Sequence, residues 1–392
     1  SMKFQHRSAV THKASEKEEC TQWSSILPVN ASAGGHPPKS GAMLLTLITN
    51  DDGPHSAALF PFVEALQSHA KCVVMIPCQE ESLCSKSIKG GDMVCKLVSR
   101  NQQAEVRDLE APLPALPEED GSTYLMHLCS STPASIVNFA LHGCSPRLLT
   151  SLQRVGASDG KFDLVISGPN MGQNCSQSCI LSSGTCGAAM EAALAGYPAV
   201  ALSLTCTQWP LPQQKLPLAA QLGAHLIQQL RSCLLQEGNA SGWPPGLWFN
   251  INIPLDCLPQ EWEALVQDEQ ALPCEDIPVR ITKPWEGCCF EKMFTMETDC
   301  REGESAPGTL RCTSFRPLLP YEIRDPPANT DVFALQCNAV SVSPLFARLQ
   351  IVPIPCSGRE SSSSTPVELE PSMDATIFEV LPPSWRGTIV EK

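Results

Sequence analysis

The sequence has few of the basic residues that a nucleic-acid-binding protein needs. Lys and Arg together number 27 in 392 residues, against 41 Asp and Glu, so the formal net charge is -14. Affinity for a phosphate backbone depends largely on neutralisation by Lys and Arg, and the chain has no basic stripe. We therefore expect no nucleic-acid polymer as a partner. A small phosphorylated substrate remains compatible, because a bound cation would reverse the local field.

Long apolar runs are also missing. No stretch reaches the roughly 20 apolar residues that a membrane-spanning helix requires, and the polar N-terminal segment contains no signal-peptide core. We expect no membrane partner and a cytoplasmic location. The basic residues Lys3, Arg7 and Lys13 leave targeting to an organelle open.

The chain contains 20 cysteines but no Cys-x-x-Cys pair. Many of them sit inside apolar runs, as Cys72 does before Val73, which is typical of buried thiols. Without paired cysteines or histidines at finger-like spacing, a structural zinc site is not expected. The pattern favours free thiols in a reducing compartment over a disulfide scaffold.

Hydrophobic periodicity predicts an α/β fold. Residues 1–42 lack periodicity and are interpreted as a disordered leader, and a βαβ unit follows. The predicted strands are 43–49, 72–76, 123–128, 162–167, 199–204 and 247–253, and the predicted helices include 56–69, 184–195 and 215–236. This alternation predicts a Rossmann-like, mostly parallel sheet with helices on both faces. We expect a catalytic core over 43–254, an extension of the same domain over 255–350 and a tail over 351–392.

Polar side chains follow two of the predicted strands. Asp51 and Asp52 come directly after the first strand and before Gly53, and Asn170 comes shortly after the strand that ends at Ser167. The carboxyl ends of parallel strands are where α/β proteins place their sites. Carboxylate and amide oxygens suit a hard cation such as Mg²⁺ or Mn²⁺. Taken alone, however, the Asp-Asp-Gly sequence also fits an ordinary turn with solvated carboxylates.

A glycine-opened helix of small residues begins at Ser183-Gly184-Thr185. Backbone N–H groups at such a start, with the two hydroxyls, would make a cradle for an anion. The alternative is a plain helix cap, because Ser and Thr are preferred caps in any protein. No Walker A, Gly-x-Gly-x-x-Gly or Gly-x-Ser-x-Gly sequence directly follows the first strand. A metal site beside an anion cradle would indicate phosphoryl chemistry.

Together these blocks resemble the SurE family of metal-dependent 5'-nucleotidases and acid phosphatases. The matching blocks are Thr49-Asn50-Asp51-Asp52-Gly53, Ser167-Gly168-Pro169-Asn170-Met171-Gly172-Gln173-Asn174, Ser183-Gly184-Thr185-Cys186-Gly187-Ala188-Ala189-Met190-Glu191, and Thr330-Asp331 with Val340–Leu345. The resemblance covers roughly residues 43–350. The chain departs from the family pattern at Ala57-Ala58, where Pro-Gly is usual, and at Ser135, where an aspartate is common.

The resemblance implies particular site residues. The implied metal ligands are Asp51, Asp52, Ser82 and Asn170, and the implied phosphate contacts are Asn174, Ser183, Gly184 and Thr185. Judged on the residues alone, Ser82 is one solvated loop serine among several, so it is the resemblance that singles it out.

The resemblance also implies an activity. We expect a phosphomonoesterase that hydrolyses nucleoside monophosphates through a metal-activated water, with Asp51 and Asp52 as catalytic residues. The sequence leaves open whether one of these carboxylates accepts the water's proton or attacks the phosphorus directly. The alternative is a non-catalytic protein of the same family that binds nucleotide or phosphate. A homodimer or homotetramer is implied, in which the segment after Pro254 reaches a neighbouring subunit.

Overall fold

A computed structural model describes most of the residues between 44 and 348. The described ranges are 44–98, 107–108, 123–129, 131–143, 162–206, 212–234, 243–258, 277–290, 294–296, 312–314 and 318–348. The predicted leader (1–42) and tail (351–392) lie outside these ranges.

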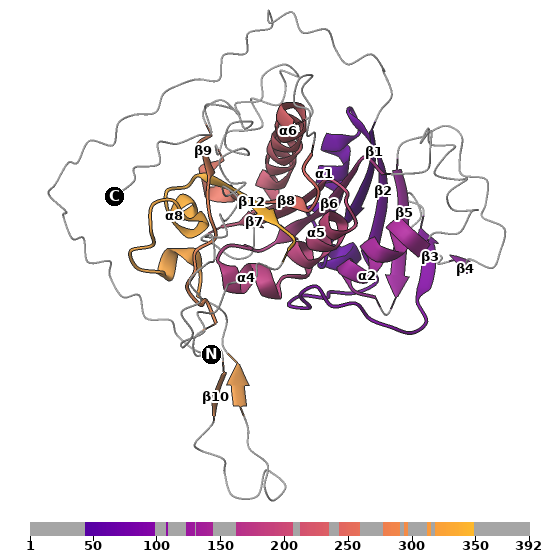
Figure 1. The fold of residues 1–392 in the computed structure, drawn as a ribbon, viewed down its shortest axis with the longest axis horizontal. Helices are drawn as coiled ribbons and strands as arrows, with labels where there is room; N and C mark the ends of the chain where they lie inside the picture. The colour runs from indigo at the N-terminus through magenta and orange to yellow at the C-terminus, as the bar shows by residue number, and fades with distance from the viewer. Residues whose placement is uncertain are drawn as a thin grey trace, which may run out of the picture.

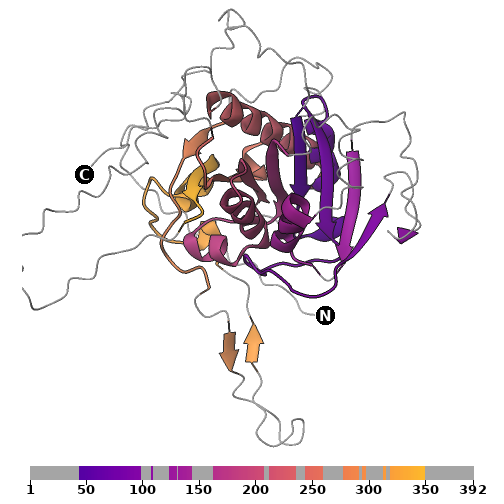
Figure 2. The same cartoon turned by 45° about the vertical axis from the view of Figure 1, so that its right-hand side comes forward.

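The described strands form one large sheet, in the order β4-β3-β5-β2-β1-β6-β7-β8-β12-β9. Its strands are β1 (Leu44–Thr49), β2 (Ala70–Pro77), β3 (Val94–Val98), β4 (Arg107–Asp108), β5 (Thr123–Cys129), β6 (Leu164–Met171), β7 (Ala199–Thr205), β8 (Leu247–Pro254), β9 (Val279–Ile281) and β12 (Val340–Phe346). The run from β5 to β8 is parallel throughout, whereas β3 and β12 pair antiparallel to their neighbours β5 and β8. A separate antiparallel ribbon, β10 (Phe294–Met296) with β11 (Cys312–Ser314), projects away from the sheet in both Figure 1 and Figure 2.

Helices cover both faces of the sheet (Figure 1), which confirms the predicted α/β class. The α-helices are α1 (Leu59–Leu66), α2 (Pro133–Asn138), α4 (Gln177–Ser182), α5 (Gly184–Leu194), α6 (Leu216–Leu234) and α8 (Asp331–Gln336). Short 3-10 turns are η1 (Gly53–His55), η3 (Gln213–Lys215), η4 (Leu255–Cys257) and η6 (Pro320–Glu322), and η2 (Phe139–Gly143) is a π-helix.

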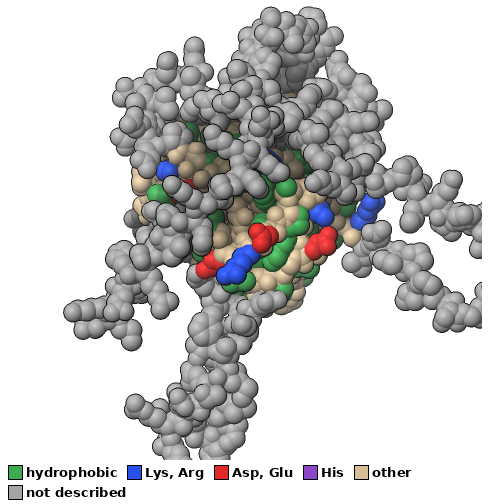
Figure 3. Space-filling model, turned by 90° about the vertical axis from the view of Figure 1, so that its left-hand side faces the viewer, with side chains coloured by type: hydrophobic (Ala, Val, Ile, Leu, Met, Phe, Trp, Pro, Cys, Tyr) green, Lys and Arg blue, Asp and Glu red, His purple; other side chains and the backbone are tan. Residues whose placement is uncertain are grey.

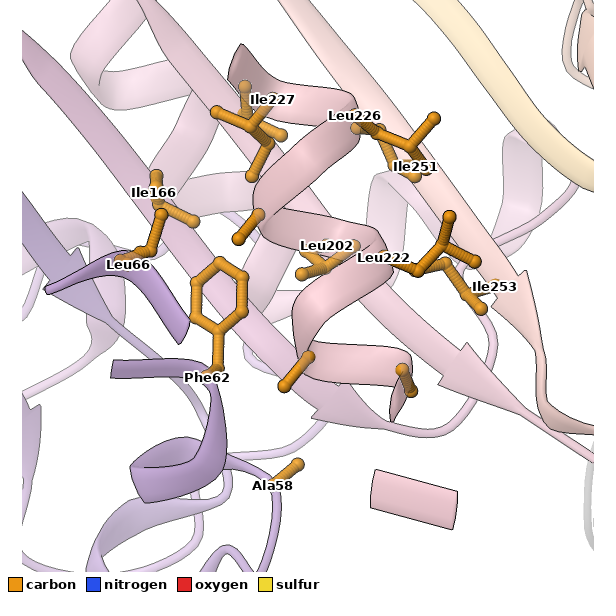
Figure 4. Packing of buried hydrophobic residues seen from close by; sticks show 14 of the residues in the cluster. Ala58, Phe62, Leu66, Ile166, Leu202, Leu222, Leu226, Ile227, Ile251 and Ile253 are labelled. Atoms are coloured by element: carbon orange, nitrogen blue, oxygen red, sulfur yellow. The ribbon is translucent and has the colours of Figure 1, made fainter. Parts of the chain in front are cut away.

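The alternation of side chains along β1 explains the two layers. Leu45 and Leu47 join a cluster with α2 and α5 on one face, whereas Ile48 joins a cluster with α1 and α6 on the other. Such alternation follows from the two-residue period of a strand. In the second cluster Phe62 of α1 lies between α6 and the strands (Figure 4) and is fully buried. Truncating such a residue to alanine typically costs about 3–5 kcal/mol.

Two of the boundaries that differ from the prediction lie beside the candidate site. Helix α1 begins at Leu59 rather than residue 56, because Gly53–His55 first forms a 3-10 turn that contains Pro54. Strand β6 continues to Met171 rather than ending at residue 167. Its pairing with β7 is irregular between Ser167 and Asn170, where the Gly168-Pro169 peptide is cis.

The segment after Pro254 adds strands to the same sheet. Strand β12 lies between β8 and β9, and α8 packs against it. Hydrophobic periodicity missed these elements because β9 and α8 are only three and six residues long and because β12 contains Pro344. Whether this segment reaches another subunit stays a prediction.

Three surface and thiol features complete the description. On the described surface seen in Figure 3, acidic and basic side chains lie beside one another. Among the described residues no helix is both long and apolar enough to cross a membrane.

Eleven described cysteines are free thiols, as expected, but Cys78 is disulfide-bonded, so the expectation of free thiols does not hold at that position.

Candidate active site

The candidate site lies at the carboxyl ends of β1 and β6, which are adjacent parallel strands in the middle of the sheet. From β1 the chain passes to β2 on one side, and β6, β7 and β8 follow on the other. Such a switch point is where open α/β sheets bind their ligands.

A tight turn at the end of β1 positions the two aspartates. The side chain of Asn50 accepts a hydrogen bond from the Gly53 N–H (3.2 Å) and donates one to the Gly53 carbonyl (3.1 Å). Gly53 has a φ of 72°, and a Cβ there would lie 3.0 Å from the Gln79 backbone. The turn therefore requires glycine, and it fixes Asp51 and Asp52 directly beyond the strand.

Asp51 is held by the first turn of α5. Its Oδ1 accepts a hydrogen bond from the Thr185 hydroxyl (2.6 Å), and its Oδ2 accepts one from the Thr185 N–H (3.0 Å). Asp51 as a whole residue is 3% exposed. A Cβ on Gly184 would lie 3.0 Å from Asp51 Oδ2, so a larger residue would crowd the carboxylate. The arrangement places a negative group at the positive end of a helix.

Asp52 is held by β6 and by its own loop. Its Oδ2 accepts hydrogen bonds from the Met171 N–H (2.9 Å) and the Ser56 hydroxyl (3.4 Å). Its Oδ1 accepts none from the described residues. One carboxylate oxygen of Asp52 is therefore available for a ligand.

Burial and neighbouring negative charge disfavour the charged forms of both aspartates. Burial, followed by the charge of Asp51, raises the pKa of Asp52 to about 7. Burial also raises the pKa of Asp51, although the two hydrogen bonds from Thr185 oppose the shift. Among the described residues no Lys, Arg or His forms an ion pair with either carboxylate. A divalent cation between them would offset the repulsion and favour ionisation of both.

The third predicted ligand that fits such an ion is Asn170. Its amide nitrogen donates to the Gly172 carbonyl (2.8 Å), which leaves its amide oxygen without a partner in the described part of the chain. Two carboxylates and an amide oxygen form the hard oxygen donor set that Mg²⁺ or Mn²⁺ prefers. The described residues contain no cluster of three or more His, Cys, Asp or Glu arranged for a metal. The predicted metal-ligand set contains only two residues of those types, Asp51 and Asp52, because its other two members are Asn170 and Ser82.

Ser82 lies in the loop after β2, and among the described residues no hydrogen bond joins its side chain to Asp51 or Asp52. The preceding residue, Glu81, donates its N–H to the Asp51 carbonyl (2.8 Å). The Ser82 hydroxyl is exposed and donates to Glu80 Oε1 (2.8 Å). Ser82 as a metal ligand therefore stays a prediction that needs its hydroxyl to leave Glu80.

The predicted phosphate contacts already have protein partners. The Ser183 hydroxyl accepts a hydrogen bond from the Cys186 N–H (3.1 Å) and so caps α5, which is the helix-cap alternative given by the sequence. The Thr185 hydroxyl and N–H bind Asp51. Asn174 is 5% exposed, and its amide nitrogen donates to the Ser203 hydroxyl (2.8 Å), which ties its loop to β7. Phosphate binding by these residues and Gly184 stays a prediction.

Sequence reasoning missed two side chains beside the aspartates. Ser56 binds Asp52, and the charge of Glu80 is close enough to raise the pKa of both aspartates. Glu80 stands in the polar run that directly follows β2. Because Glu80 follows a parallel strand next to β1, its position in the sequence could have indicated that it lies near the site.

Comparison with known proteins identifies the family. The profile described as "Survival protein SurE" matches residues 46–272, which is more than half of the chain. The chain belongs to the SurE family.

Several SurE relatives are similar over about half of the chain. A protein named "5'-nucleotidase SurE" from Methanocella arvoryzae is 29% identical over 55% of this chain and 68% of its own length. A protein of the same name from Polaromonas naphthalenivorans is 32% identical over 53% of this chain and 64% of its own length. The chain thus spans about two thirds of these relatives.

A solved structure supports the SurE fold. The crystal structure of the SurE protein from Aquifex aeolicus superimposes with a TM-score of 0.51 and 20% identity. The match covers 78% of this chain and 94% of that one. At this identity the similarity concerns the fold.

Proposed function

We propose that this chain is a divalent-metal-dependent phosphomonoesterase that hydrolyses nucleoside monophosphates, in the manner of a 5'-nucleotidase. Its curated relatives carry the name "5'-nucleotidase SurE". The observation that carries the proposal is the adjacent pair of buried Asp51 and half-buried Asp52, neither of which has a paired cation among the described residues. A pair of this kind is stable as two anions when a cation compensates it.

Asp51, Asp52 and Asn170 would hold the ion, with Ser82 as the fourth predicted ligand. When bound, a divalent ion supplies charge stabilisation for the phosphoryl group and lowers the pKa of a coordinated water. Mg²⁺ and Mn²⁺ both suit this oxygen donor set.

The chain's own contribution is to orient these groups before substrate arrives. Thr185 fixes Asp51 through two hydrogen bonds, and Met171 and Ser56 fix Asp52. Such preorganised dipoles stabilise developing charge without reorganisation. Both a water and an Asp52 oxygen remain compatible with this geometry as the attacking group. The proposed oligomer, a homodimer or homotetramer, rests on the family resemblance alone.

The test is phosphate release from a panel of nucleoside monophosphates by chelator-treated protein, with Mg²⁺ or Mn²⁺ restored. We expect metal-dependent release that Asp52→Asn lowers by at least 100-fold, because this variant keeps the shape but removes the charge that holds the ion. The control is Asp92→Asn, which changes an exposed aspartate and should leave release unchanged.

Near-normal turnover by a folded Asp52→Asn protein would contradict the site. Tight nucleotide binding by the wild type without release, over many hours and with several metals, would instead favour the non-catalytic alternative.

A further inference from the structure

Three polar side chains meet at the carboxyl end of β7, beside the predicted metal site. Thr205 is the last residue of β7, and its hydroxyl donates to Gln173 Oε1 at 3.3 Å. The same hydroxyl lies 3.2 Å from the Tyr321 hydroxyl. The three residues come from separate elements: the loop after β6, strand β7 and the turn η6. Neither the family motifs nor the predicted ligands include Thr205 or Tyr321.

The register of the sheet places this cluster next to Asp52. Leu204 of β7 pairs with Met171 of β6, and the Met171 N–H donates to Asp52 Oδ2. Thr205 follows Leu204, so its backbone lies about one strand spacing (about 4.8 Å) and one residue (about 3.4 Å) from the backbone that binds Asp52. A group attached to a phosphate at the metal site would reach the cluster.

Hydrogen bonds hold both the turn that carries Tyr321 and the Tyr321 hydroxyl. Gln336 Nε2 donates to the carbonyls of Pro320 (2.8 Å) and Ile323 (2.7 Å), at the start of η6 and directly after it. Thr205 holds the hydroxyl at the other end of the ring. The residue is half-buried, so part of its surface remains accessible. A ring held in place in this way binds a flat partner at a low entropic cost.

The amide nitrogen of Gln173 donates no hydrogen bond to the described residues. Its Oε1 accepts the hydrogen bond from Thr205, and its Nε2 has no partner among the described residues. A half-buried amide without a partner favours a ligand that brings an acceptor. An aromatic ring beside a free amide donor suits a nucleobase, which stacks through its face and is recognised at its edge.

We propose that Tyr321 and Gln173 form the nucleoside subsite of this enzyme, in which the base stacks on Tyr321 and a nucleoside acceptor binds the Gln173 amide. Thr205 is a positioning residue that orders both side chains. The inference rests on the proposed function, because it assigns the part of a nucleoside monophosphate that extends beyond the phosphate. Stacking of a base on an aromatic side chain is worth about 1–3 kcal/mol, which corresponds to a factor of roughly 5 to 150 in affinity.

The experiment compares two kinds of substrate that share a phosphate. Adenosine, guanosine, cytidine and uridine 5'-monophosphates carry a base, whereas glycerol phosphate carries none. We expect Tyr321→Ala to lower kcat/KM for the nucleotides about tenfold or more, chiefly through KM, and to leave glycerol phosphate within twofold. Tyr321→Phe keeps the ring and should stay within about threefold of the wild type on both. Tyr197→Phe removes a tyrosine hydroxyl near the opposite ends of the strands and serves as the control.

Gln173→Ala should lower nucleotide turnover in the same selective way. Equal losses on both substrates, or unchanged nucleotide kinetics in Tyr321→Ala, would overturn the subsite while leaving the phosphomonoesterase in place. If the wild type hydrolyses neither substrate, the proposed function fails and the subsite is judged by calorimetry with the free nucleosides. Binding that weakens tenfold in Tyr321→Ala supports it, and absence of nucleoside binding to the wild type refutes it.

Discussion

Substituting Gly187 by alanine tests how the loop after β2 is held against the site. A Cβ on Gly187 would lie 2.3 Å from the Ser85 carbonyl oxygen and 2.8 Å from Lys86 Cα. Ordinary contacts begin at 3.4 Å, so the loop would have to retreat by about 1 Å. The atoms in contact are backbone atoms, which cannot move aside as a flexible side chain can.

The loop resists this movement because several bonds tie it to the helices. Ser85 donates its N–H to the Ser182 carbonyl (2.9 Å) and its hydroxyl to the Leu181 carbonyl (2.6 Å). Lys86 forms an ion pair with Glu191 of α5. Overpacking typically costs about 1–3 kcal/mol, and each lost hydrogen bond adds about 1 kcal/mol. The higher helix propensity of alanine offsets about 1 kcal/mol of this loss of stability.

We therefore expect Gly187→Ala to lower the free energy of unfolding by about 1–4 kcal/mol, which corresponds to a fall in Tm of roughly 2 to 16 °C for a domain of this size. Thermal unfolding followed by circular dichroism measures it. Gly90→Ala is the control, because a Cβ at Gly90 has no atom within 4 Å. Because the same loop carries Ser82, Mg²⁺ affinity should fall as well. A Gly187→Ala protein as stable as the wild type would refute the reasoning.

Two further substitutions test buried carboxylates. Thr185→Val removes the 2.6 Å hydrogen bond to Asp51, a charge-assisted bond worth about 1.5–3 kcal/mol, whereas Thr185→Ser keeps it. Chemical denaturation should therefore show a larger loss of unfolding free energy for Thr185→Val than for Thr185→Ser. Equal losses in the two variants would contradict this role of the hydroxyl. Burial raises the pKa of Asp331 from 3.8 to about 6, so its contribution to stability is full below pH 4 and is lost as the pH rises through 6. Between pH 4 and 7 the wild type should lose about 3 kcal/mol more stability than Asp331→Asn, as measured by urea unfolding at each pH. Parallel pH profiles of the two proteins would rule out this shift.

The central elements of the fold were predictable because their sequence patterns are local. The strand before Asp51 and the helix after Ser183 have long apolar or small-residue runs, and the structure has them within a residue of the predicted limits. The extension of β6 to Met171 was not predictable, since it includes the Gly168-Pro169 sequence that ordinarily ends a strand.

The candidate site was predictable in position more than in contacts. That Asp51 and Asn170 lie at the same edge of the sheet was predictable, because each follows a parallel strand at its carboxyl end. That β1 and β6 are direct neighbours was not, since other strands come between them in the sequence. That Thr185 binds Asp51 did not, because the bond joins residues 134 positions apart and depends on how closely Gly184 lets the helix approach. The contact of Tyr321 with Thr205 was not predictable for the same reason, since Tyr321 lies on a turn 116 residues later in the sequence.

The place of β12 in the sheet bears on shortened forms of this chain. The family profile ends at residue 272, yet six residues of β12 pair with β8, all of whose residues are buried. A chain cut at residue 272 would leave the apolar β8 as an open edge, with a row of unpaired N–H and C=O groups. Such edges pair with other chains, so the shortened protein would aggregate even though every predicted metal ligand were present.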